Sequence, residues 1–347
     1  MRIDLRAYSR LLAELVRRGG VDEAQAKTLE ENLTWCDMVG RRNHGIERLP
    51  ILLERVAAGG IACPCDPGFV RVGLNSCKLD AANGFGHHAG RVAMDRACEL
   101  AARSGVGVVT VHNTNFFGAG GYYAYLAAER GMIGLALSNS FPKVAAAGGI
   151  APVLGTNPLA LAAPRRGGRP VLIDMSTAAV AGSTIREAID RDVDLAEGIA
   201  IDAAGRPITD PRKALAGTLL PAAGAKGYGL AILVELLAGV LSGAGVAGQV
   251  SSMYKHVAAG GNNGHFFLAL DVRHWMAMHE WYDRVEALAA ALLGSGPPGS
   301  VRLPGDRCWA EYERSLAEGI LIEDHTFAHI ERLADSLGIS IDQRQPA

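Results

Sequence analysis

Apolar residues recur every three to four positions near the start of the chain, a spacing that predicts helices with one buried face. Residues 5–18 and 22–37 show this pattern, and a Gly-Gly pair separates the two segments. A third helix is expected from about residue 45 to residue 58, where a second Gly-Gly pair ends it. The chain therefore opens on helices, and His44 stands at or just before the N-terminus of the third one.

Short β-branched runs, each entered from a Gly or Pro turn, predict strands in the middle of the chain. These runs cover residues 105–112, 132–140, 169–176 and 265–272. Helical spacing returns between and after them, over residues 88–105, 121–131, 279–294 and 326–338 and in the apolar segment after Lys226. The pattern predicts an α/β (α+β) protein in which the helical ends pack beside a central sheet.

The composition indicates a folded protein without a nucleic-acid partner. With 347 residues and 49% hydrophobic content, the chain can bury a sizeable core. Its 34 basic residues nearly cancel 36 acidic ones, and no Lys/Arg run could follow a phosphate backbone. The N-terminus lacks the apolar core of an export signal, and the most apolar stretch, residues 227–245, is interrupted by Glu235 and glycines. We therefore expect a soluble, cytoplasmic protein outside the membrane.

Common metal and nucleotide motifs are weak or missing in the sequence. The six cysteines form no C-x-x-C pair, so we expect reduced thiols. Cys63 and Cys65 could chelate a metal, but no second pair stands nearby, so a loop is the simpler interpretation and no metal is predicted. The nearest Rossmann-like segment, GFGHHAG at 84–90, has alanine as its third glycine and no strand before it. A P-loop sequence is absent too.

His44 and Arg48 form the most informative pair for chemistry, because a spacing of four places both on one face of a helix. Imidazole titrates near neutrality and can protonate the oxygen formed when hydride reaches a carbonyl carbon. Guanidinium offers a planar fork for a substrate carboxylate. The same pair could instead cap a helix and bind Glu47 or another acid.

Polar residues also follow several predicted strands, where ligand contacts are common. They stand at residues 113–115, 138–140 and 155–158. The first group precedes a glycine-rich helix start whose free N–H groups can hold an anion, although an ordinary turn explains the pattern equally well. Lys226 lies among small residues before an apolar helix and could meet a phosphate or carboxylate, or simply be solvated.

Taken together, these segments resemble the malate/L-lactate/ureidoglycolate dehydrogenase family, which also includes sulfolactate dehydrogenase, diketogulonate reductase and cyclic ketimine reductases. The motifs run in order from His44 to about residue 322: HGIERL, NTNFFGAGGYYAYLAAERGMIGLALSNS, LGTNPLALAAP, VLIDMST, AIDAAGRPITDP, LLPAAGAKGYGLAILVELLAGVLSGA, GHFFLALD and RLPGD. The resemblance implies a homodimeric NAD(P)H-dependent oxidoreductase with a non-Rossmann fold, in which helical terminal segments pack beside a central, largely antiparallel sheet flanked by helices. We expect a helical domain of residues 1–75, joined by the segment 305–347, beside a central domain of residues 76–304.

The resemblance also implies roles for individual residues. His44 would be the proton donor to a 2-oxo acid or imine, and Arg48 would anchor its carboxylate. Substrate contacts are expected from Asn43, Arg48, Asn115, Phe116, Ser140 and Thr156. Contacts to NADH or NADPH are expected from His44, Gly118, Asn139, Asn157, Asp174, Met175, Ser176, Lys226, Gly227, Pro304, Gly305 and Asp306.

Several residues depart from the family pattern around the expected site. Asn43 replaces the usual serine before the histidine, and Phe116 replaces a second histidine that is a catalytic acid/base in some members. Thr184 stands where lysine is common, Ile199 where tryptophan is common, and Lys143 where an uncharged residue is usual. These changes make the expected pocket more apolar at Phe116 and leave His44 as its proton carrier.

Three hypotheses follow from this pattern. The first is a reductase of a 2-oxo or 2-imino acid whose side chain packs on Phe116, with His44 as the sole acid. The second is a biosynthetic enzyme of the same fold with a changed, even non-redox, reaction. The third is a non-catalytic nucleotide-binding protein. The sequence determines neither the substrate nor the choice between NADH and NADPH.

Overall fold

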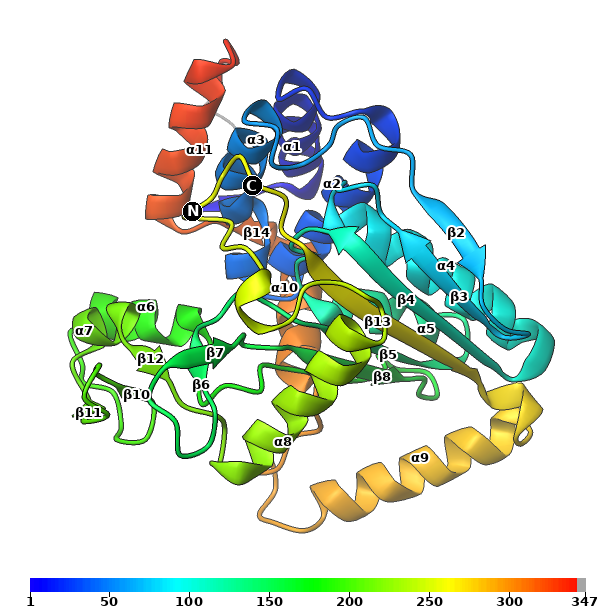
Figure 1. Cartoon of the computed structure of the whole chain (residues 1–347). Helices are drawn as coiled ribbons and strands as arrows, with labels where there is room; N and C mark the ends of the chain where they lie inside the picture. The colour runs from blue at the N-terminus through cyan, green and yellow to red at the C-terminus, as the bar shows by residue number, and fades with distance from the viewer. Residues whose placement is uncertain (342–347) are drawn as a thin grey trace.

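The two ends of the chain form one helical part in the computed structural model, which describes residues 1–341 and, for Ser183, the backbone alone. Figure 1 shows α11 standing with the N-terminal helices at one end of the molecule. β1 and β14 pair antiparallel, and apolar residues from both ends share a core. The elements are β1 (Arg2–Ile3), α1 (Leu5–Arg18), α2 (Glu23–Met38), α3 (Leu49–Ala57), α10 (Asp306–Glu318), β14 (Ile320–Leu321) and α11 (Asp324–Ser336).

A seven-stranded sheet forms the centre, in the order β2-β3-β4-β13-β5-β8-β9. The pair β3 and β4 is parallel, and the other described pairs of this sheet are antiparallel. Helices α4 (Gly86–Ser104) and α5 (Gly120–Ala128) pack against it through a core rich in alanine. The strands are β2 (Gly68–Arg71), β3 (Ser76–Asp80), β4 (Val106–Thr114), β5 (Met132–Ser138), β8 (Leu159–Ala163), β9 (Val171–Met175) and β13 (Asn263–Asp271).

A smaller sheet, in the order β11-β10-β12-β6-β7, lies to one side with helices α6 and α7 (Figure 1). Its strands span two or three residues, so no alternating pattern announces them in the sequence. These elements are β6 (Val144–Ala145), β7 (Pro152–Leu154), α6 (Gly182–Asp190), β10 (Ala200–Ile201), β11 (Pro207–Ile208), α7 (Pro211–Ala216) and β12 (Thr218–Leu219). Short 3-10 turns follow at Ala247–Gln249 and Val272–His274.

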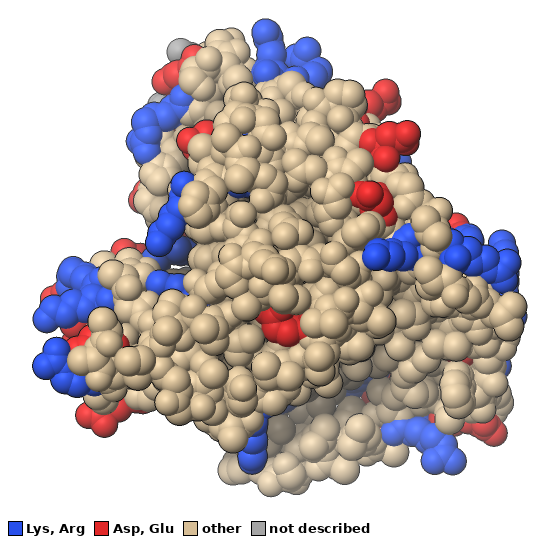
Figure 2. All heavy atoms as spheres, in the orientation of Figure 1, with Lys and Arg blue, Asp and Glu red and all other residues tan. Residues whose placement is uncertain are grey.

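Two further helices stand at the surface. α8 (Ala225–Val234) continues as a π-helical turn over Glu235–Val240, and α9 (Met278–Leu293) follows β13. Figure 2 shows that Lys, Arg, Asp and Glu gather at the edges of one face of the molecule and leave its centre, the region of α8 in Figure 1, with little charge. Among the described residues, no helix combines the length and apolarity needed to cross a membrane.

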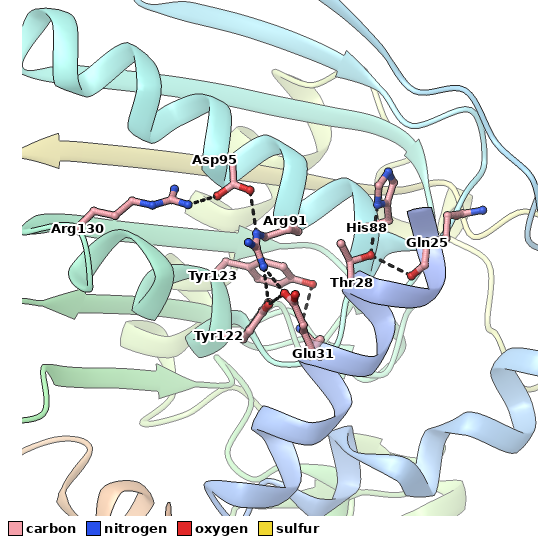
Figure 3. Close-up of polar contacts among 10 residues, drawn as sticks. Gln25, Thr28, Glu31, His88, Arg91, Asp95, Tyr122, Tyr123 and Arg130 are labelled. Carbon is pink, nitrogen blue, oxygen red and sulfur yellow. Dashed lines mark hydrogen bonds and ion pairs between the residues drawn. The ribbon is translucent and has the colours of Figure 1, made fainter. Parts of the chain in front are cut away.

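Polar contacts fasten α2 to the helices that flank the sheet (Figure 3). Arg91 of α4 pairs with Glu31 of α2, and Tyr122 of α5 donates to the same carboxylate at 3.1 Å. Asp95 accepts from Arg91 Nε at 2.8 Å and from Arg130 at 2.6 Å. This network joins three helices and so holds the helical part, which carries His44, in place against the sheet.

The structure confirms the predicted fold class, a largely antiparallel central sheet flanked by helices and by the helical chain ends. The helix predicted from residue 45 to residue 58 is present as α3, but its predicted start is wrong, because α3 begins only at Leu49 after two 3-10 turns, Arg42–His44 and Ile46–Arg48. Gly45 between the turns is extended (φ −88°, ψ −147°), which interrupts the helix. The division into a helical domain of residues 1–75 with 305–347 and a central domain of residues 76–304 stays a prediction. The last six residues of the predicted helical domain, 342–347, lie outside the described residues.

Candidate active site

A cavity of about 460 Å³ opens where the helical part, one end of the central sheet and the small sheet meet. Turns after strands supply most of its polar lining, and the helical part supplies His44 and Arg48. Such a concave site at the junction of structural units is where small ligands usually bind. The lining residues are Arg41, Asn43, His44, Arg48, 116–120, 138–141, Lys143, Thr156, Pro158, 174–176, Ala181, Gly182, Ile185, Arg186, Leu215, Leu219, 251–255 and Asn263.

The turn that carries His44 also brings Arg48 to the same cavity wall. Arg48 Nε donates to the carbonyl oxygen of Asn43 at 2.6 Å, and Arg48 Nη2 lies 3.3 Å from Glu47 Oε1. The His44 ring stacks on Phe116, with ring centroids 5.8 Å apart. His44 Nδ1 is buried and has no hydrogen-bond partner within residues 1–341. The wall therefore presents a guanidinium beside an imidazole whose Nδ1 has no partner among the described residues.

The surroundings of His44 keep its imidazole neutral. Burial lowers the pKa of His44 from its ordinary value of 6.5 to about 3, and the positive charge of Arg48 acts in the same direction, as does that of Arg41. A neutral imidazole can accept a proton at any pH well above 3. A carboxylate bound at Arg48 would offset the cationic charge and raise the pKa of His44, which would prepare it to carry a proton.

Asp37 of α2 lies beneath this turn and holds it. Its Oδ2 accepts from the backbone N–H of Ile46 at 2.8 Å and from the Tyr8 hydroxyl at 2.6 Å. Burial raises the pKa of Asp37 to about 7, against the lowering effect of these hydrogen bonds. A Cβ atom on Gly45 would stand 1.9 Å from Asp37 Oδ1, so glycine is required there. Asp37 is not among the site residues predicted from the sequence, because its partners lie nine and 29 positions away.

Cationic side chains outnumber acidic ones on the cavity wall. The acid on this wall, Asp174, lies 3.7 Å from Arg41, and burial raises the pKa of Asp174 while Arg41 lowers it. Glu47 stands near Arg48 and within 4.0 Å of Arg186. The cations are Arg41, Arg48, Lys143, Arg186 and Lys255. This balance favours anionic ligands.

Hydrogen bonds from two asparagines fix the turns that end β5 and precede β8. Asn139 and Asn157 each donate through Nδ2 to Glu235 of the π-helical turn, at 3.3 and 3.0 Å. Asn157 Oδ1 accepts from the backbone N–H of Ser140 at 3.1 Å. Ser140 Oγ in turn accepts from the backbone N–H of Thr156 at 3.0 Å. Because the asparagine amides are engaged in this framework, the hydroxyls of Ser140 and Thr156 are better placed to contact a ligand.

The predicted substrate residues fall into two groups. Those on the cavity wall are Asn43, Arg48, Phe116, Ser140 and Thr156. Asn115 is outside the lining and only 2% exposed. Its Oδ1 accepts from Arg55 Nη2 and from the backbone N–H of Gly261, both at 2.8 Å, so Asn115 holds a neighbouring loop. The departures Thr184 and Ile199 are outside the lining as well, whereas Lys143 is part of it.

The predicted cofactor residues also divide between the cavity and its surroundings. The lining includes His44, Gly118, Asn139, Asp174, Met175 and Ser176, while Asn157 lies behind it. The other predicted residues flank β9. The carbonyl oxygen of Pro304 accepts from the backbone N–H of Leu172 at 3.0 Å, and Gly305 and Asp306 follow Pro304 in the chain. Gly227, next to Lys226, packs on the turn at Thr177. Arg186, Tyr254 and Lys255 line the cavity without having been assigned to the site from the sequence.

The cavity wall fits a dinucleotide cofactor in its chemistry. Gly118 and Gly120 are among the lining residues, just before and at the start of α5, and bring no side chain to the wall. Asp174 Oδ2 is buried and accepts no hydrogen bond within the described part of the chain, so it can accept one from a hydroxyl or amide of a ligand. The cations described above suit phosphate groups. Within the same residues, no cluster of three His, Cys, Asp or Glu side chains could hold a metal ion.

Comparisons with known proteins identify the family of the chain. The family model for malate/L-lactate dehydrogenase matches residues 3–331. Malate dehydrogenase of Pyrococcus abyssi is 34% identical over 332 residues, which cover 92% of this chain and 90% of that protein. The (2R)-3-sulfolactate dehydrogenase (NADP(+)) of Chromohalobacter salexigens is 34% identical over 305 residues, covering 88% of this chain and 90% of that protein.

Solved structures show the same fold. The sulfolactate dehydrogenase of Methanocaldococcus jannaschii superimposes with a TM-score of 0.90 at 31% identity, covering 98% of both chains. Members of the family use NAD+ or NADP+. The match of nearly the whole chain to the family model, together with these identities, shows that the chain belongs to the malate/L-lactate dehydrogenase family and is an NAD(P)-dependent dehydrogenase.

Proposed function

We propose that this enzyme interconverts a 2-oxo acid and its 2-hydroxy acid, with His44 as the proton donor and acceptor and Arg48 as the carboxylate anchor. The observation that carries the proposal is the unpartnered, buried Nδ1 of His44 beside the Arg48 guanidinium on one cavity wall. The cationic excess on that wall supports an acidic substrate. The substrate side chain then packs on Phe116, which stacks on His44.

The chain's own residues account for the steps around the reacting carbon. When bound, the reduced nicotinamide supplies the hydride. Arg48 binds the substrate carboxylate and is itself held by the carbonyl oxygen of Asn43. His44 gives a proton to the oxygen that forms, and in the reverse direction removes it. Phe116 covers one face of the His44 ring and excludes water from it.

The low pKa of His44 predicts different pH profiles for the two directions. In the free enzyme the pKa of His44 is about 3, so the base form needed for oxidation is present throughout the range of about pH 5 to 8. The acid form needed for reduction becomes tenfold rarer with each pH unit. We expect kcat/KM for reduction to fall about tenfold per pH unit over that range, while kcat/KM for oxidation shows no inflection from His44. Initial rates at constant ionic strength measure both values of kcat/KM. A titration midpoint near pH 6.5 in either profile would contradict the lowered pKa of His44.

A substrate panel tests the proposed function directly. Small 2-oxo acids and cyclic imines of 2-imino acids are assayed by loss of reduced-nicotinamide absorbance, with NADH and NADPH in turn. Turnover of a 2-oxo acid supports the proposal, and turnover of imines alone shifts the reaction to a carbon–nitrogen bond. A chain that is not stabilised against heating by either cofactor and turns over nothing in the panel would overturn it.

We also infer a homodimer, as the family resemblance implies. α8 and its π-helical continuation expose apolar side chains, and Figure 2 shows little charge over this region. Leu236 and Val240 are 54% and 59% exposed. A second copy that covers this face would remove apolar surface from water. Light scattering should give about twice the 36.4 kDa of one chain, and the mass of a single chain would refute the dimer.

A further inference from the structure

Lys143 is a cation held rigidly at the cavity wall. Its backbone N–H donates to Leu154 at 2.7 Å, and its carbonyl oxygen accepts from Leu219 at 2.9 Å. The ammonium donates to the carbonyl oxygens of Leu215 at 2.6 Å and Gly217 at 3.2 Å. An ammonium has three donors, so one is left for a further acceptor. Lys143 is therefore placed by the fold at a defined point, unlike a lysine that extends into solvent.

Lys255 adds a second cation to the same wall, from the loop that follows Met253. Both lysines line the cavity; burial lowers the pKa of Lys143, and the positive charge of Lys255 lowers it further. Arg55 supports the base of the Lys255 loop by donating to the carbonyl oxygens of His256 at 3.1 Å and Ala259 at 2.8 Å. No carboxylate within residues 1–341 forms an ion pair with either lysine.

This lysine pair is separate from the Arg48 anchor but belongs to the same cavity. Tyr254, next to Lys255, has its ring 5.9 Å from the Arg48 guanidinium and 6.2 Å from the ring of Phe141. Phe141 stands two residues before Lys143. These two aromatic rings thus connect the Arg48 side of the cavity with the segments that carry the lysines. A group bound at Arg48 and a group bound at the lysines can therefore belong to the same ligand molecule.

We infer that Lys143 and Lys255 form a second anion-binding subsite, which takes a carboxylate, sulfonate or phosphate group while Arg48 holds the 2-oxo or 2-hydroxy acid. Two like charges at a cavity wall without a counter-ion are unfavourable unless an anion joins them. The anion belongs either to the far end of a substrate with two acid groups or to a phosphate of the dinucleotide. The inference rests on the proposed function for the role of Arg48.

The test compares Lys143→Met and Lys255→Met with a matched control, Lys213→Met. Lys213 lies on α7 outside the cavity, is 77% exposed, and faces Asp210 at 3.8 Å. Binding is first measured without cofactor, as the rise in melting temperature caused by malate, which has two acid groups, or by L-lactate, which has one. We expect malate to stabilise the unmodified chain more than lactate does, and either cavity variant to lose that excess. The control should keep it.

A second measurement identifies the source of the anion. Fluorescence titration gives the Kd for NADH and NADPH with each variant. A tenfold or larger rise in Kd, with the malate excess intact, assigns the subsite to a cofactor phosphate. Loss of the malate excess with an unchanged Kd for both cofactors assigns it to the substrate. If neither measurement changes in either variant, the subsite is refuted.

The outcomes also separate this inference from the proposed function. Lys255 is exposed, so Lys255→Met carries the test even if Lys143→Met fails to fold. A chain that binds malate through the lysines yet turns over no 2-oxo acid would refute the proposed function and keep the subsite. If the unmodified chain turns over 2-oxo acids, and both variants keep its KM for oxaloacetate and pyruvate and its cofactor Kd, the proposed function stands and the subsite is refuted.

Discussion

Replacing His44 by alanine is expected to lower kcat by about 10²-fold or more, with little change in the Kd for NADH or NADPH. The His44 imidazole lines the cavity beside Arg48 and stacks on Phe116, an apolar ring that cannot carry a proton in its place. Steady-state rates in both directions and a fluorescence titration of the cofactor measure the two quantities separately.

An exposed histidine provides the control for this variant. His279 on α9 lies outside the cavity lining, so His279→Ala should keep both kcat and cofactor affinity. Near-normal turnover in His44→Ala would show that another group moves the proton. Loss of cofactor affinity equal to the loss of kcat would show instead that His44 mainly shapes the binding site.

A methyl group at residue 45 should have the other large effect. In Gly45→Ala the new Cβ would stand 1.9 Å from Asp37 Oδ1, and Asp37 cannot swing aside without losing its hydrogen bonds to Tyr8 and Ile46. Overpacking of this kind, with a buried acceptor displaced, costs about 3 kcal/mol of unfolding free energy. Because Gly45 joins His44 to the turn that ends in Arg48, kcat/KM should fall as well. Denaturant unfolding and steady-state kinetics measure these effects.

Gly229→Ala is the matched control for the added methyl group. Gly229 lies inside α8, and a Cβ atom there meets nothing within 4 Å. Alanine is favoured over glycine in a helix by about 0.5–1 kcal/mol, so this variant should be as stable as the parent or slightly more so. If Gly45→Ala were as stable and as active as Gly229→Ala, the turn would not depend on the close contact with Asp37.

The predicted helices that matched the structure best are those with a long, uninterrupted period. Residues 5–18 were expected and observed as one helix, because a 14-residue segment with one buried face needs no distant partner to define it. The helix expected from residue 45 begins only at Leu49, because the Asp37 carboxylate accepts from the backbone N–H of Ile46 and so shapes the turns before it. The strands β10, β11 and β12 escaped prediction because two residues give no period.

For the site, the sequence determined which residues could do the chemistry, and the tertiary structure decided how they are arranged. The order of motifs pointed to His44, Arg48, Phe116, Ser140 and Thr156, all of which line the cavity. It did not point to Asp37, Glu235 or Lys255. Glu235 holds Asn139 from 96 positions away, and Asn115 turned out to bind Arg55 from 60 positions away. Such contacts depend on the packing of distant segments, which local spacing does not encode, so only the folded chain shows them.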